Sequence, residues 1–62
     1  MVKCIENKHK CKNWKVGSKY GILTVNGVKK IGTEWGLYLK LPQDIDFSQK
    51  QFEFGMCKFH CL

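Results

Sequence analysis

Cysteine and histidine side chains gather at the two ends of this chain of 62 residues. Both residue types bind transition metals, and cysteine also forms disulfides or acts as a nucleophile. Two groups of three make up the set, with no cysteine or histidine between them: Cys4, His9 and Cys11 near one end, and Cys57, His60 and Cys61 near the other. If the first and last strands of the fold pair, the two groups meet in space.

A zinc ion could join the two groups. Structural zinc takes four Cys or His ligands in a tetrahedron, so the four cysteines would suffice, as would a mixed set with either histidine. Such a clip would close a loop of about 50 residues. Closing a long loop gives a large stabilisation, because it lowers the conformational entropy of the unfolded chain. Cys57 and Cys61 have a spacing suited to zinc, whereas Cys4 and Cys11 are further apart than zinc knuckles usually place them.

Two other interpretations stay open for the cysteines. Cys4 or Cys11 could form a disulfide with Cys57 or Cys61, and four cysteines allow three connectivities. Alternatively all four are free thiols, with Cys4 a small buried hydrophobe in a strand and both histidines exposed. Because residues 1–4 begin no signal peptide, we expect a cytoplasmic protein, where disulfides are rare, with a mature secreted peptide as the alternative.

Enzymatic chemistry finds little support in the sequence. Neither Ser18 nor Ser48 has the local context of a nucleophile elbow. The only close carboxylate pair, Asp44 and Asp46, falls in an expected turn, and the glycines are spread over turns instead of forming a phosphate loop. We therefore expect no catalytic residues.

The elements that position these side chains must fit one small domain, residues 1–62. A chain of this length buries only about 60% of its unfolded surface, so a staple is expected to support the core. A hydrophobic fraction of 44% and an aromatic fraction of 13% indicate a folded chain. No apolar run approaches the roughly 20 residues of a membrane span, so we expect no membrane partner.

Strand patterns dominate the chain, because glycines interrupt every window long enough for a stable helix. Asn26-Gly27 separates two apolar, β-branched runs and is typical of a two-residue hairpin turn. That register places Val25 opposite Val28 and Ile22 opposite Ile31.

Further short strands are expected at residues 2–5, 35–41 and 51–54, with the last continuing over 56–59. In the second of these, Leu37, Leu39 and Leu41 should share one face, and a single helical turn is expected at residues 46–50. The result is an all-β fold, a single small barrel of about five short strands with a C-terminal tail that contains cysteines and a histidine.

Three motifs resemble those of small Src-homology-3-like proteins encoded by bacteriophages of Gram-positive hosts. They are Lys3-Cys4-Ile5-Glu6-Asn7, Lys15-Val16-Gly17-Ser18-Lys19-Tyr20 and Gln51-Phe52-Glu53. The resemblance covers residues 2–54 and implies a Src-homology-3-like barrel that acts in the cytoplasm of a bacterial host. The chain departs from the group in its basic charge and in residues 55–62, and no catalytic residue carries over.

Positive charge is concentrated in the N-terminal third. The chain has 11 lysines, no arginine and five acidic residues, a net charge of +6. Residues 1–19 carry six lysines against one glutamate, whereas residues 31–56 carry two lysines against four acidic residues. A lysine-only surface suits attraction to phosphates without sequence readout, or docking on an acidic protein.

Three function classes follow from this charge pattern. We favour a non-enzymatic phage accessory protein that binds an acidic host protein and inhibits or redirects it. The alternatives are a nucleic-acid-binding barrel and a secreted, disulfide-stapled toxin. The candidate contact residues are a basic loop with an aromatic side chain and a second aromatic patch: Lys8, Lys10, Lys12, Trp14 and Lys15, then Trp35 and Tyr38.

Overall fold

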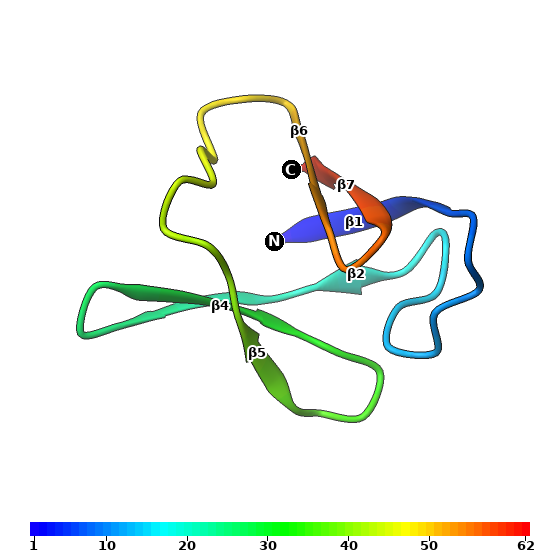
Figure 1. Cartoon of the computed structure of the whole chain (residues 1–62), viewed down its shortest axis with the longest axis horizontal. Coiled ribbons are helices and arrows are strands. Elements are labelled where there is room, and N and C mark those ends of the chain that lie inside the picture. Colours follow the sequence, from blue (N-terminus) through cyan, green and yellow to red (C-terminus); the bar gives the residue numbers. More distant parts are fainter.

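The computed structural model describes all 62 residues as seven strands joined by turns and loops, with no helix (Figure 1). The strands are β1 (Val2–Asn7), β2 (Lys19–Tyr20), β3 (Ile22–Val25), β4 (Val28–Gly32), β5 (Tyr38–Lys40), β6 (Gln51–Phe54) and β7 (Cys57–Cys61). They form two antiparallel sheets, in the orders β2-β1-β7-β6 and β3-β4-β5. No helix capable of crossing a membrane is present.

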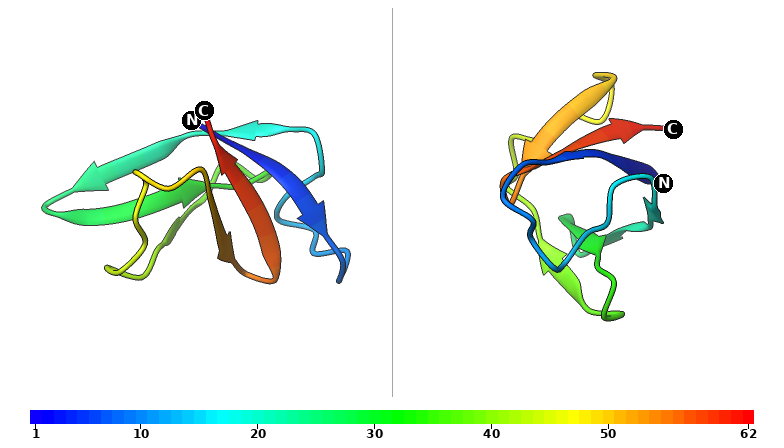
Figure 2. Two further views of the ribbon diagram at one scale, coloured as in Figure 1. Left: turned by 90° about the horizontal axis from the view of Figure 1, so that it is seen from above. Right: turned by 90° about the vertical axis from the view of Figure 1, so that its right-hand side faces the viewer.

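The expected all-β, barrel-like fold is confirmed, with more strands than the sequence indicated. The run from Tyr20 to Val25 is divided at Gly21, where the chain leaves the first sheet and enters the second. A second division at the C-terminal end produces β6 and β7. Both sheets stay small, and their strands curl around one core (Figure 2).

The hairpin of β3 and β4 has the register that its turn dipeptide predicts. Val25 lies opposite Val28 and Ile22 lies opposite Ile31. Asn26 and Gly27 both have positive φ, 51° and 77°, as a two-residue turn of type I′ requires. Local sequence was therefore enough to set this pairing.

The expected C-terminal tail is instead a central strand of the first sheet, which corrects the sequence analysis. The chain reverses at Gly55 and Met56, and β7 pairs with β6 on one side and with β1 on the other. Because β1 and β7 pair, the two ends of the chain meet (Figure 2), and the Leu62 N–H donates to the Met1 carbonyl at 3.1 Å.

Two smaller expectations are also corrected. Residues 46–50 form an isolated turn in place of a helical one: the Asp46 carbonyl accepts the Gln49 N–H at 3.3 Å, its side chain accepts the Ser48 N–H at 2.9 Å, and no further backbone bond extends the turn. Leu37 does not share the buried face of Leu41, since the chain is still turning at Gly36 and β5 begins only at Tyr38. Leu37 is consequently 65% exposed.

Trp14 connects the two sheets at the centre of the core. Its ring packs edge-on against Phe54 and Phe59 of the first sheet, with ring centroids 5.8 and 5.3 Å away. Its indole Nε1–H donates to the Gly32 carbonyl of the second sheet at 2.9 Å. The buried hydrophobic residues around it come from every part of the chain: Val2, Cys4, Tyr20, Ile31, Leu41, Ile45, Phe52, Cys57 and Phe59.

Gly55 leaves room for Trp14, and this contact is testable. A Cβ at Gly55 would lie 2.6 Å from Cζ3 of Trp14, whereas a Cβ at Gly27 would meet nothing within 4 Å. Both glycines have positive φ, so Gly27→Ala is the matched control for backbone strain, which is about 1 kcal/mol. We expect Gly55→Ala to lower the free energy of unfolding by about 2 kcal/mol more, because it overpacks the core. Urea denaturation measures both variants, and equal losses would contradict the contact.

Candidate functional site

An open groove of about 660 Å³ lies between the loop that follows β1 and the turn that precedes β5. The structure brings together side chains that are about 20 residues apart in sequence, namely Lys10, Lys12 and Lys15 from the loop and Trp35 from the turn. The remaining lining residues are Asn7, Cys11, Trp14, Val16 and Glu34. Of the seven predicted contact residues, these three lysines and Trp35 therefore line one groove with accessible side chains. Trp14 also lines it but is buried.

The Asn7 side chain holds the lysine-bearing loop in shape. Its Nδ2 donates to the carbonyls of Cys11 and Trp14 at 2.9 and 2.8 Å, and its Oδ1 accepts the Cys11 N–H at 2.9 Å. One amide at the end of β1 thus satisfies three polar groups of a loop that has no strand partner of its own. The loop is consequently an ordered support for the lysines.

Tyr20 and Glu34 connect the two walls of the groove. The Tyr20 hydroxyl accepts the Lys15 N–H at 2.6 Å and donates to the Glu34 Oε1 at 3.0 Å. The Glu34 N–H in turn donates to the Asn13 carbonyl at 2.8 Å. Burial raises the pKa of Tyr20, and the nearby Glu34 carboxylate raises it further, so the hydroxyl keeps its proton and donates this bond.

The groove presents positive charge and one large exposed ring. No ion pair involves Lys10, Lys12 or Lys15, because the ion pairs of this chain involve only Lys8 and Lys58. Trp35 exposes 65% of its surface, whereas Trp14 exposes 2%. The structure therefore places Trp14 in the core, where its partners on both sheets hold it, and leaves Trp35 as the aromatic contact.

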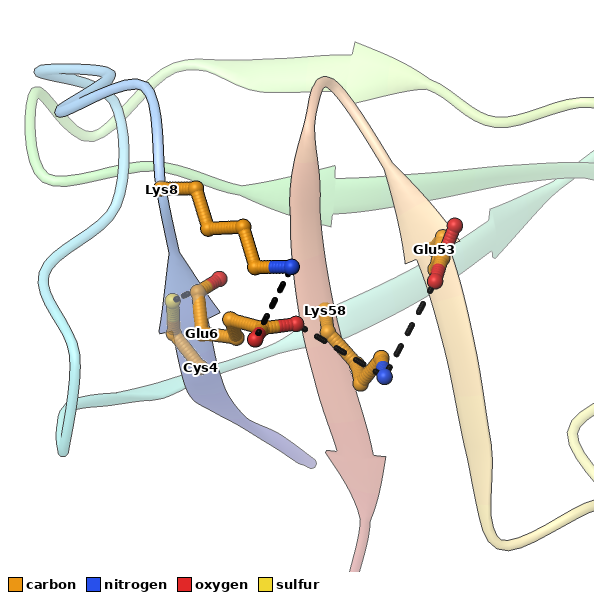
Figure 3. A network of polar contacts seen from close by, with 5 residues as sticks. All are labelled: Cys4, Glu6, Lys8, Glu53 and Lys58. Carbon is orange, nitrogen blue, oxygen red and sulfur yellow. Dashed lines mark hydrogen bonds and ion pairs between the residues drawn. The ribbon is translucent and has the colours of Figure 1, made fainter.

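Lys8 and Tyr38 lie outside the groove. Lys8 Nζ is 3.7 Å from a Glu6 oxygen, at one end of a chain of ion pairs that continues through Lys58 to Glu53 across the outer face of the first sheet (Figure 3). Tyr38 covers Gly21 and Gly32 on the outer face of the second sheet, where a Cβ on Gly21 would lie 3.2 Å from its hydroxyl and one on Gly32 would lie 3.4 Å from its ring. The predicted contact set is thus divided among three surfaces.

The cysteines divide into a cluster and a distant member. Cys4 and Cys57 are buried with interacting thiols, Cys4 also donates to the Glu6 carbonyl at 3.8 Å, and Cys11 is close enough to influence both. Cys61 lies opposite Val2 at the other end of β7. Because Phe59 stands between Cys57 and Cys61 on the inward face, about 13 Å of strand separates the two.

The four cysteines are free thiols in this structure, and no group of three or more His, Cys, Asp or Glu side chains is placed to hold a metal ion. His60 lies between Lys3 and Gln51 on β7, on the outward face opposite the inward thiols, while exposed His9 borders a shallow hollow beside Cys57. Pairing of β1 with β7 therefore brings Cys4 beside Cys57 and leaves Cys61 apart. A zinc or disulfide staple stays a prediction.

Three residues that line the groove were not predicted from the sequence: Asn7, Val16 and Glu34. Asn7 had a signal, since an asparagine that ends a strand before a loop commonly bonds to nearby backbone. Glu34 adjoins Trp35 in sequence, but its contact with Tyr20 depends on how the two sheets pack.

Comparison with protein-family models, curated proteins and solved structures finds no match to this chain.

The buried thiol of Cys57 makes stability depend on pH. Burial raises the pKa of Cys57 from 9.0 to about 11, and the Cys4 thiol raises it as well. The folded state then holds a proton that the unfolded state has lost, so stability falls as pH rises from about 9 to about 11. Urea unfolding over this range should show a shallower decline for Cys57→Ala than for the parent. Cys61→Ala is the control, and identical slopes for parent and Cys57→Ala would contradict this assignment.

Proposed function

We propose that this chain is a non-enzymatic binding protein whose groove takes up an acidic segment of a partner protein. The observation that carries the proposal is the grouping of Lys10, Lys12 and Lys15, without ion pairs, around the exposed ring of Trp35. Unpaired lysines on one surface attract a negative surface and speed its association. A large exposed indole is the kind of side chain that dominates binding energy at protein interfaces.

Glu34 supports a protein partner over a continuous phosphate backbone. Its carboxylate lies in the groove among the lysines, where it would repel a phosphate that ran through the groove. A protein segment can place a carboxylate beside each lysine and an uncharged side chain beside Glu34. Val16, which is 54% exposed, adds an apolar contact near Trp35.

The order already present in the groove also supports binding. The loop is held by Asn7 and by the link between Tyr20 and Glu34, so little backbone freedom would be lost when a partner docks. The resemblance to phage proteins suggests the setting: the partner would be an acidic host protein that this chain inhibits or redirects in the bacterial cytoplasm.

Single-stranded nucleic acid is the second candidate partner, and Trp35 is the observation that favours it. An exposed ring flanked by lysines can stack on a base while the lysines contact the adjacent phosphates. Binding of this kind weakens steeply with salt.

Reversal of the groove charges should abolish capture of the partner without unfolding the protein. The variant is Lys10→Glu, Lys12→Glu and Lys15→Glu, and the control with the same net charge is Lys3→Glu, Lys19→Glu and Lys50→Glu. None of these six lysines forms an ion pair, and all but half-buried Lys3 are exposed, so both variants should unfold within about 0.5 kcal/mol of the parent. Trp35→Ala should weaken binding by about 2 kcal/mol through loss of the indole contact.

The measurement is capture from a bacterial lysate, with and without nuclease, followed by titration of the captured protein. We expect parent and control to retain a protein that the groove variant loses, with no effect of nuclease. Retention by the groove variant would place the binding surface elsewhere, and loss after nuclease would favour the second candidate.

A further inference from the structure

Strand β3 has one side without a strand partner. It pairs with β4 on its other side only. Strand β1 accompanies β2 up to the pair of Val2 and Tyr20, and β3 is the outer strand of its own sheet. The hairpin of β3 and β4 projects from the body of the molecule as a result (Figure 1).

The register shows which main-chain groups are free on that side. In an antiparallel hairpin with a two-residue turn, alternate residues exchange their hydrogen bonds with the neighbouring strand, beginning with the pair that flanks the turn. Val25 and then Leu23 are therefore bonded to β4, and the Gly32 N–H donates to the Gly21 carbonyl at 3.0 Å in the same series. The N–H and C=O groups of Ile22 and Thr24 point away from β4, and no other backbone hydrogen bond uses them.

This edge lacks the features that usually keep a sheet edge unpaired. Edge strands are commonly protected by a charge, a proline or a bulge. The outer strand β6 carries Glu53, and β5 carries Lys40 and is soon followed by Pro42. Residues 22–25 contain none of these, while Leu23 and Val25 are 45% and 48% exposed.

Lysines on the outer face of the same sheet indicate the charge of an occupant. Lys30 lies beside Leu23 on one side and opposite Lys40 on the other, and neither lysine forms an ion pair. Like charges directly opposite each other on a sheet are destabilising, so a carboxylate placed near them would be favoured. A second copy of this chain would bring another net charge of +6 to the same edge.

We propose that the free edge of β3 accepts an extended acidic segment of a partner protein as an added strand. Its main chain bonds to Ile22 and Thr24, and its apolar side chains contact Leu23 and Val25. A residue of the added strand that pairs with Leu23 would lie two strand spacings, about 10 Å, from Lys30. A glutamate side chain at that position and the Lys30 side chain can together span this distance. The surface shares no residue with the groove, so this inference does not depend on the function proposed for it.

The probe is a short peptide of alternating glutamate and valine, with a peptide of alternating lysine and valine as its control. Amide hydrogen exchange, followed by NMR, reports directly on the free groups. We expect the acidic peptide to slow exchange at Ile22 and Thr24, with little change at Leu23 and Val25, which already bond to β4. Unchanged exchange at Ile22 and Thr24 in saturating peptide would overturn the proposal.

Two variants separate the main-chain and charge contributions. Thr24→Pro removes a free N–H without breaking a bond to β4, and should weaken peptide binding about tenfold. Lys30→Glu, which leaves the backbone unaltered, should weaken binding of the acidic peptide several-fold, whereas the remote control Lys50→Glu should change it much less.

The groove variant with reversed charges at Lys10, Lys12 and Lys15 should retain slowed exchange at Ile22 and Thr24. Loss of that effect would assign the peptide to the groove. Sedimentation completes the test, because a dimer of the parent that Thr24→Pro makes monomeric would show that a second copy occupies the edge. Loss of the slowed exchange in the groove variant, or a dimer that Thr24→Pro makes monomeric, would overturn the proposal.

Discussion

The position of Trp14 between the two sheets is the constraint on which the rest of this structure depends. A domain of 62 residues has few buried side chains, and this one contacts both halves of the barrel. Its ring packs on Phe54 and Phe59, while its N–H reaches the Gly32 carbonyl. Burial of an indole is favourable only where its N–H finds an acceptor, so the angle between the sheets and the position of the ring are fixed together.

The same constraint organises the candidate binding surface. Trp14 belongs to the loop that carries Lys10, Lys12 and Lys15, so burial of its ring anchors that loop. Asn7 at the start of the loop, and Tyr20 just beyond its end, satisfy the backbone groups that the loop leaves without strand partners. Anchoring groups point inward and lysines point outward, so one segment can support the fold and still present charge to a partner.

The ion pairs of this chain gather on one of its two sheets. On the first sheet, Lys58 lies between Glu6 and Glu53, and this network neutralises part of the outer face (Figure 3). Such exposed ion pairs add little stability, but they remove free positive charge from that face. Lys30 and Lys40 on the second sheet have no corresponding carboxylate. Lysines without ion pairs therefore lie at the groove, on the second sheet as Lys30 and Lys40, and at the β1–β2 side of the first sheet as Lys3 and Lys19.

The sequence by itself determined the features that depend on neighbouring residues. Asn26-Gly27 specified the turn and register of β3 and β4, because only a few residue types tolerate positive φ there. Glycine spacing and alternating apolar residues indicated strands in place of helices. Only the tertiary structure decided that residues 57–61 form a central strand and that Trp35 joins the lysines. It likewise decided that Cys61 stands apart from the other cysteines. Those outcomes depend on the pairing of β1 with β7 and on the change of sheet at Gly21, and such long-range pairings are set by the packing of the whole core.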